Sequence, residues 1–335
     1  MYPLCAQLRC HAPTTRDAAC IAWYLCSMHR FAAISALILT TPALANPADA
    51  LFDWITVGDP GNAPAPDIHL DLSNDIGTVN HTYRLTRTPV TTERYFDFVQ
   101  AYRPYLPADY VDFGFSGVHI RINNSDPDNI VYELRDHVRQ HPTTASLEWA
   151  ARYMNWLHNG MSSEREAFES GVYDTSTFYY DDQGRPQHDF TRSADARYWI
   201  PTLDEMLKAA HYDPDKNNGE GGWWQFANRS DTPLVIARLE DGGEQIGDLV
   251  SLYNWQVGQY PETASAYGLL DFQGTVYQWA IEDQFNSLFG VGSYAGEDPV
   301  QSMWDGSLIA GQLPLHQTGL TRGSVSPPPS PPPHP

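Results

Sequence analysis

The residues that could carry out chemistry in this chain of 335 residues are carboxylates, histidines and aromatic rings, because all of its cysteines lie near the N-terminus. They are Cys5, Cys10, Cys20 and Cys26. The sequence after residue 26 therefore offers no thiol nucleophile, no thiolate ligand for a metal and no disulfide. Any site there must be built from oxygen and nitrogen ligands or from aromatic surfaces.

Two histidines stand four residues apart, a spacing that can place two imidazoles on one side of a helix to hold a metal. They are His137 and His141 in "HVRQHP". Pro142 follows directly and breaks a helix at this point. We therefore expect a solvated pair of histidines rather than a metal site.

Oxygen ligands alternate in the segment "DPDKNNGEGG", as they do at the start of a calcium-binding EF-hand loop. The alternating residues are Asp213, Asp215 and Asn217. An EF-hand also needs glycine at its sixth position and glutamate at its twelfth, and here the twelfth residue is Trp224. The pattern favours a solvated turn.

Aromatic side chains gather between residues 223 and 255, where they could stack on a sugar ring or pack in a core. The candidates for ligand binding are Trp223, Trp224, Tyr253 and Trp255, and the partner would be a carbohydrate or another extracellular protein. The adjacent acids Glu282 and Asp283 could be a glycosidase pair, although spacing in sequence does not give their separation in space. The sequence leaves these alternatives open.

The chain is strongly acidic, with a net charge of −21 and only two lysines, Lys208 and Lys216. Residues 1–45 contain three arginines and one aspartate, so the remaining 290 residues carry −23. Such a surface repels phosphate backbones and anionic lipid. We expect no binding to nucleic acid and a preference for neutral or cationic partners.

The N-terminal segment is typical of a leader. Residues 28–45 combine a short basic start, the apolar run "FAAISALILTTPALA" and small residues at a cleavage position, which predicts a secretory signal with no membrane span in the mature chain. We expect one domain over residues 46–325 and an extended proline-rich tail over residues 326–335. The mature protein would be secreted, periplasmic or on the cell surface.

Three helices are predicted from apolar spacing and cap residues. Thr91 and Thr92 can cap a helix that buries Tyr95, Phe98, Val99 and Tyr102. A second helix presents an apolar stripe and ends at Asn159-Gly160; the stripe is Leu147, Ala150, Ala151, Met154 and Leu157. A third begins with the capping box Thr202-Leu203-Asp204-Glu205, buries Leu203, Met206, Leu207 and Ala210, and stops at Asp213-Pro214.

Short alternating runs predict strands within residues 51–58, 81–90, 118–123 and 248–255. Residues 161–195 are polar and aromatic without a helical period, which favours a long loop or hairpin. Few helices and long loops predict an irregular α+β domain.

Four blocks in a fixed order resemble one protein family. They are "RTPVTTERYFDFV", "EWAARYMNWLHNG", "ARYWIPTLDEMLKAAHYDP" and "SAYGLLDFQGTVYQW". The residues in these blocks, and the order of the blocks, resemble those of the sulfatase-modifying-factor, or formylglycine-generating-enzyme-like, family. The resemblance extends over roughly residues 51–322. This resemblance implies a C-type-lectin-like fold, with two to three helices around a twisted sheet and an aromatic core.

The chain departs from that family at the positions that bind the catalytic metal. The resemblance implies a pair of copper-binding cysteines near the C-terminus, or a histidine-bound iron in a related branch, and this sequence has neither pattern. It also implies calcium ligands in two segments, which here correspond to Asn254, Trp255, Gly274 and Gln278. Because Gln278 stands where the family places glutamate, a charged ligand is lost, and calcium is possible but not required.

Two functions follow as expectations. The first is a secreted binding or structural module that keeps the family fold without formylglycine-generating activity. The second is an enzyme of another class that uses acidic and aromatic residues in the same cleft. A deep pocket with converging, pKa-shifted groups would favour the enzyme, whereas a shallow, aromatic surface would favour the module.

Overall fold

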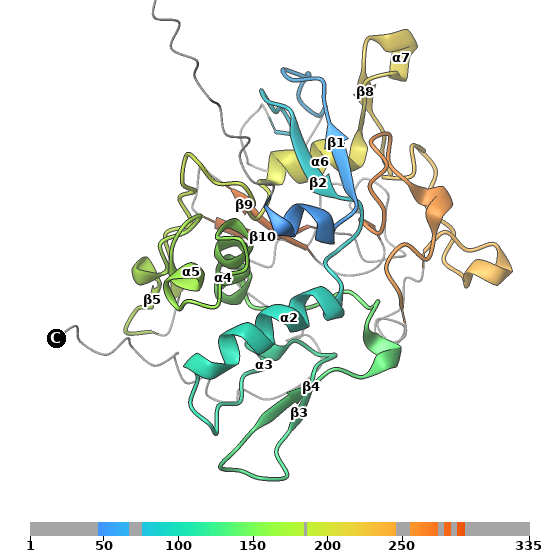
Figure 1. The fold of residues 1–335 in the computed structure, drawn as a ribbon. Coiled ribbons are helices and arrows are strands. Elements are labelled where there is room, and N and C mark those ends of the chain that lie inside the picture. Colours follow the sequence, from blue (N-terminus) through green and yellow to red (C-terminus); the bar gives the residue numbers. More distant parts are fainter. Residues whose placement is uncertain are drawn as a thin grey trace, which may run out of the picture. The chain divides into compact units, whose positions relative to one another are not determined.

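The computed structural model describes residues 46–66, 76–183, 186–245, 255–273, 278–282 and 287–291. The chain is an α+β protein whose described part has few helices and small sheets. Its longer helices are α2 (Thr92–Tyr102), α4 (Leu147–His158) and α6 (Leu203–His211) (Figure 1). None of the helices in these ranges is long and apolar enough to cross a membrane.

The cap residues fix where the helices begin, as the sequence predicts. Thr91 accepts a hydrogen bond from the backbone N–H of Arg94 at 3.4 Å and starts α2. At α6 both halves of the capping box form: the Glu205 N–H donates to Thr202 Oγ1 at 3.1 Å, and the Thr202 N–H donates to Glu205 Oε2 at 2.9 Å. Helix α6 ends at His211, two residues before the expected stop, because Tyr212–Asp213 forms a short strand.

Helix α4 is buried on more of its surface than its apolar stripe predicts. Leu147, Ala151 and Leu157 of the stripe are buried, but Ala150 and Met154 are only half-buried. Another side of the helix carries the buried residues Trp149, Tyr153 and Trp156, and Asn155 is buried one turn after Ala151. The reason is that α4 lies between two groups of packed side chains, so the stripe alone underestimates its burial. Asn159 caps its end as expected.

The strands pair into five two-stranded antiparallel sheets within the described part, in place of one twisted sheet. All ten of these strands have only two to five residues, at or below the usual strand length. The pairs are β1 (Trp54–Val57) with β2 (Tyr83–Thr86), β3 (Arg121–Asn123) with β4 (Val131–Glu133), β5 (Tyr179–Tyr180) with β6 (Pro186–Gln187), β7 (Tyr212–Asp213) with β8 (Gly222–Trp223), and β9 (Gln278–Glu282) with β10 (Ser287–Val291).

The remaining elements are single turns of helix. They are α3 (Phe113–Ser116), α5 (Glu166–Glu169), α7 (Lys216–Gly219), and the 3₁₀ turns η1 (Pro47–Leu51), η2 (Arg103–Tyr105), η3 (Asp136–Val138), η4 (Thr175–Thr177), η5 (Leu239–Asp241) and η7 (Pro261–Thr263). Residues 161–195, where a long loop or hairpin is expected, contain the short β5–β6 pair and also two single helical turns, α5 and η4. Most of the predicted strand at 248–255 lies outside the described residues.

Two main cores hold these elements. An aromatic core joins α2 to α4, with Phe98 at its centre. A more aliphatic core packs the inner face of α6 against residues of β1 and of the 268–273 segment. The β1–β2 hairpin contributes Ile55 and Val57 to the aliphatic core and packs Trp54 against the aromatic core, so it connects the two.

Candidate functional site

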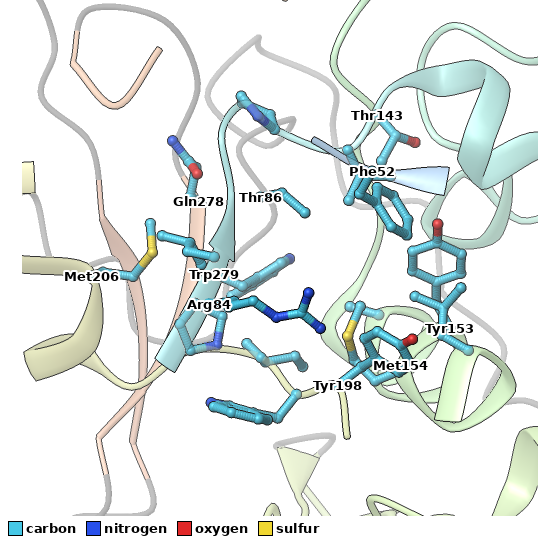
Figure 2. Close-up of a pocket in the computed structure, with 18 of the residues that line it drawn as sticks. Phe52, Arg84, Thr86, Thr143, Tyr153, Met154, Tyr198, Met206, Gln278 and Trp279 are labelled. Carbon is cyan, nitrogen blue, oxygen red and sulfur yellow. The ribbon is translucent and has the colours of Figure 1, made fainter. Parts of the chain in front are cut away.

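A cavity of about 230 Å³ is lined by residues of both cores, and we call it the aromatic cavity. Its walls come from β1 and β2, α4, the 197–201 loop, the start of α6, and β9 (Figure 2). Most of the lining is apolar or aromatic, including Phe52, Trp54, Tyr95, Tyr153, Met154, Tyr198, Met206 and Trp279. Concave, largely apolar sites with a few polar groups are the usual form of small-molecule sites.

The β1–β2 register determines which hairpin side chains are neighbours beside the cavity. Trp54 pairs with Thr86, and Thr56 pairs with Arg84, so these four lie on one face of the hairpin. The Arg84 guanidinium lies over the Trp54 ring, 5.0 Å from its centroid. Figure 2 shows this guanidinium reaching toward Met154 and Tyr198.

The phenols that line the cavity are neutral groups. Burial raises the pKa of Tyr83, Tyr95, Tyr153 and Tyr198 above the ordinary value of a phenol. Tyr83 donates its hydroxyl hydrogen to the backbone carbonyl of Glu205, and Tyr198 donates to Asp49 at 2.8 Å. The hydroxyls of Tyr95 and Tyr153 are buried without a hydrogen-bond partner among the described residues.

Glu205 is the carboxylate in the cavity wall, and its oxygens are engaged by other side chains and by backbone. Its Oε2 accepts from the Trp199 indole N–H at 2.8 Å as well as from the Thr202 backbone N–H. Its Oε1 lies 2.9 Å from His81 Nε2 and 3.8 Å from Arg192 Nη1. The side chain therefore holds the start of α6 in place and is not positioned as a free general base.

A second cluster of polar groups surrounds Glu148 at the start of α4. Its carboxylate lies 2.8 Å from His188 Nε2, accepts from Ser146 Oγ at 2.9 Å, and accepts from the Tyr180 hydroxyl. Burial alone would raise the pKa of Glu148, but the bonds from these three groups outweigh it and lower that pKa. In a catalytic triad the histidine stands between serine and acid, whereas here the acid stands between serine and histidine. The cluster therefore does not activate Ser146 as a nucleophile.

The tryptophans predicted to bind a ligand are held by contacts within the chain. Trp255 is completely buried. The Trp223 indole donates to Ala63 O at 3.0 Å, and that of Trp224 donates to Asp213 Oδ2 at 3.0 Å. None of the three lines the aromatic cavity, and Tyr253, the fourth predicted residue, lies outside the described residues.

The predicted solvated histidine pair is wrong for His141. His137 is exposed, but His141 is buried and packs edge-on against His119, with 4.8 Å between ring centroids. The backbone carbonyl of His141 accepts from Thr92 at the start of α2, which brings this residue inward. Burial lowers the pKa of His119 to about 4 and also lowers the pKa of His141, so both rings are neutral at pH 7.

The calcium ligands that the family resemblance implies are only partly within the described residues. Asn254 and Gly274 lie outside them, whereas Trp255 is buried and Gln278 begins β9. Asp283 also lies outside, so its pairing with the adjacent glutamate stays a prediction.

A metal site built from side chains is not found in the part of the chain that the structure describes. That part contains no group of three or more histidine, cysteine, aspartate or glutamate side chains that could hold a metal ion. The loop at Asp213 is closed by its own hydrogen bonds, since Asp213 Oδ1 accepts from the Asp215 N–H at 2.9 Å.

Gln278 lies in the wall of the aromatic cavity, and its side chain is hydrogen-bonded to the preceding segment at Asp271. Its amide nitrogen donates to the backbone carbonyl of Asp271 at 3.2 Å. Asp271 is itself buried, and its Oδ2 accepts from the Gly258 N–H at 2.5 Å. Burial outweighs this bond and raises the pKa of the Asp271 carboxyl to about 6.

We expect Asp271→Asn to change the pH dependence of stability. Because the folded state raises the pKa of Asp271 to about 6, its contribution to stability is present below about pH 4 and is lost as the pH rises through 6. Asparagine stays neutral and keeps an oxygen for the Gly258 N–H. From pH 4 to pH 7 the wild type should lose about 2 kcal/mol relative to the variant. Urea unfolding at both pH values measures this, and a constant difference between the two proteins would contradict it.

Comparison of the chain with protein-family models, with curated proteins and with solved structures finds no match.

Proposed function

We propose that this chain is an exported, non-catalytic binding module on a formylglycine-generating-enzyme-like, C-type-lectin-like fold, and that it binds a small aromatic molecule in the aromatic cavity. The four sequence blocks support the fold. The lack of cysteines after residue 26 supports the loss of formylglycine-generating activity, because no thiolate pair can bind copper. The cavity itself supports the binding role.

The observation that carries this proposal is the lining of the aromatic cavity, which is mostly apolar and includes the rings of Trp54, Tyr153 and Tyr198. Burying the ring of a ligand against such a lining is favourable by about 25 cal/mol for each Å² of apolar surface removed from water.

The size and chemistry of the cavity favour one ring. A cavity of ~150 Å³ in another protein binds benzene, and the 230 Å³ here leaves room for a ring with a short substituent. A sugar of the same size would bring several hydroxyls into a mostly apolar space, and each would need a partner. The neutral phenols and the engaged Glu205 offer no free base, which favours binding over catalysis.

The test uses 4-ethylphenol, a neutral ring with one hydroxyl. We expect it to bind the purified domain in isothermal titration calorimetry. Ala150→Leu places a larger side chain in the cavity wall and should weaken binding about tenfold or more, as loss of ~1.4 kcal/mol would. Tyr153→Phe removes a hydroxyl that is closed off from the cavity, so it should leave the affinity about unchanged and the unliganded domain as stable as the wild type or more so.

The matched control is Ala194→Leu, which adds the same side chain at an exposed position outside the cavity wall. It should leave the affinity unchanged. If 4-ethylphenol does not bind, or if Ala194→Leu weakens binding as much as Ala150→Leu does, the aromatic cavity is not the binding site.

A further inference from the structure

A second cavity of about 260 Å³ adjoins the aromatic cavity, and we call it the arginine cavity. It is lined by Trp54, Thr82, Tyr83, Arg84, Arg197, Tyr198 and Trp199. All of these except Thr82 also line the aromatic cavity, so a ligand can extend from one into the other. The second cavity differs in its charge, because both arginines line it but Glu205, which lines the aromatic cavity, does not.

The two arginines are not equally neutralised. Arg84 Nη2 lies 3.2 Å from Asp49 Oδ1, and both side chains are partly exposed, so the pair is a weak one. Asp49 also accepts the Tyr198 hydroxyl at the same oxygen. The Arg197 guanidinium has no ion pair or hydrogen bond within the described ranges, and the residue is exposed. One positive charge therefore remains at this end of the site.

Other charges near the site do not remove that excess. Glu205, the carboxylate in the aromatic cavity wall, is already close to His81 and Arg192. The whole chain carries −21, so a surplus of arginine beside an aromatic cavity runs against its overall charge. A local positive charge of this kind attracts an anion even when the distant surface is acidic, because salt screens charges beyond about 8–10 Å.

We propose that the ligand is an amphipathic anion, with one ring in the aromatic cavity and a carboxylate held between Arg84 and Arg197 in the arginine cavity. This inference rests on the proposed function and adds the chemical class of its ligand. Guanidinium groups match the planar geometry of a carboxylate and bind it with two parallel hydrogen bonds.

The experiment compares 3-(4-hydroxyphenyl)propionate with its neutral amide, which has the same shape. We expect calorimetry at low ionic strength to give the acid about tenfold tighter binding than the amide, and the difference to shrink at high salt. Arg197→Gln should remove most of this preference, because it should weaken binding of the acid much more than binding of the amide. Arg135→Gln makes the same change of charge at an exposed residue outside both cavities and should leave the preference intact.

The outcomes separate this inference from the proposed function. If acid and amide bind equally, or if Arg197→Gln leaves the preference for the acid unchanged, the anionic ligand is excluded while the aromatic site stands. If neither compound binds, the proposed function fails and this inference fails with it. Circular dichroism of each variant shows that any loss of binding is not a loss of folding.

Discussion

Replacing Asn155 with alanine should lower the free energy of unfolding by about 4 kcal/mol or more, since four buried backbone groups lose their partner at about 1 kcal/mol or more each. The Asn155 side chain is completely buried in α4. Its amide nitrogen donates to Phe168 O at 3.0 Å and Tyr173 O at 2.9 Å. Its oxygen accepts from the N–H groups of Val172 at 2.9 Å and Tyr173 at 2.8 Å.

Asn159→Ala is the matched control, one turn further along the same helix. The Asn159 side chain also donates to two carbonyls, Ala167 O at 3.0 Å and Ser170 O at 2.8 Å, but it is exposed and water can replace it. We expect a cost of about 1 kcal/mol or less there. Urea unfolding measures both variants. A cost for Asn155→Ala no larger than that of the control would show that the 168–173 loop does not depend on this side chain.

The effect on the binding site follows from the same contacts. Asn155 ties the 168–173 loop to one side of α4, while Ala150, Tyr153 and Met154 of the same helix line the aromatic cavity. Loosening that loop should let α4 shift in the cavity wall. A folded Asn155 variant should therefore bind ligand more weakly although Asn155 does not line the cavity.

Replacing Phe98 with alanine should cost about 3–5 kcal/mol, the usual range for removing a buried phenylalanine ring. Phe98 is completely buried at the centre of the aromatic core. Its ring lies 5.3–6.2 Å, centroid to centroid, from those of Tyr95, Tyr102, Phe115, Tyr153, Trp156 and Phe168. Alanine would leave a void that so many packed rings cannot all close. Thermal unfolding should show a fall in melting temperature on the order of 10 °C.

Phe113→Ala provides the comparison, because Phe113 is 64% exposed and loses little burial on truncation. It should change stability by less than about 0.5 kcal/mol. Phe98→Leu should fall between the two, since leucine fills part of the volume. Equal melting temperatures for the Phe98 and Phe113 alanine variants would mean that the aromatic core does not limit stability.

The sequence by itself determined the local features of this fold. Thr91, Thr202 and Glu205 predict the starts of α2 and α6 because their side chains bond backbone groups only three residues away. The end of α4 is also local, because the Asn159 backbone N–H donates to Asn155 O and Gly160 takes a positive φ of 68°. Such signals are readable because every partner lies within one turn of helix. A mid-helix asparagine such as Asn155, with its low helix propensity, suggests a tertiary role, but the sequence could not name its partners.

Only the tertiary structure decided the candidate site. The aromatic cavity brings together Trp54, Arg84, Arg197 and Gln278, which are scattered over more than two hundred residues of sequence. The sequence predicts that Trp255 binds a ligand, yet its side chain is completely buried. The same tryptophan side chain can pack in a core or bind a ligand, so the residue type does not tell the two roles apart. The difference lies in which distant segments cover it, and that depends on the packing of the whole chain.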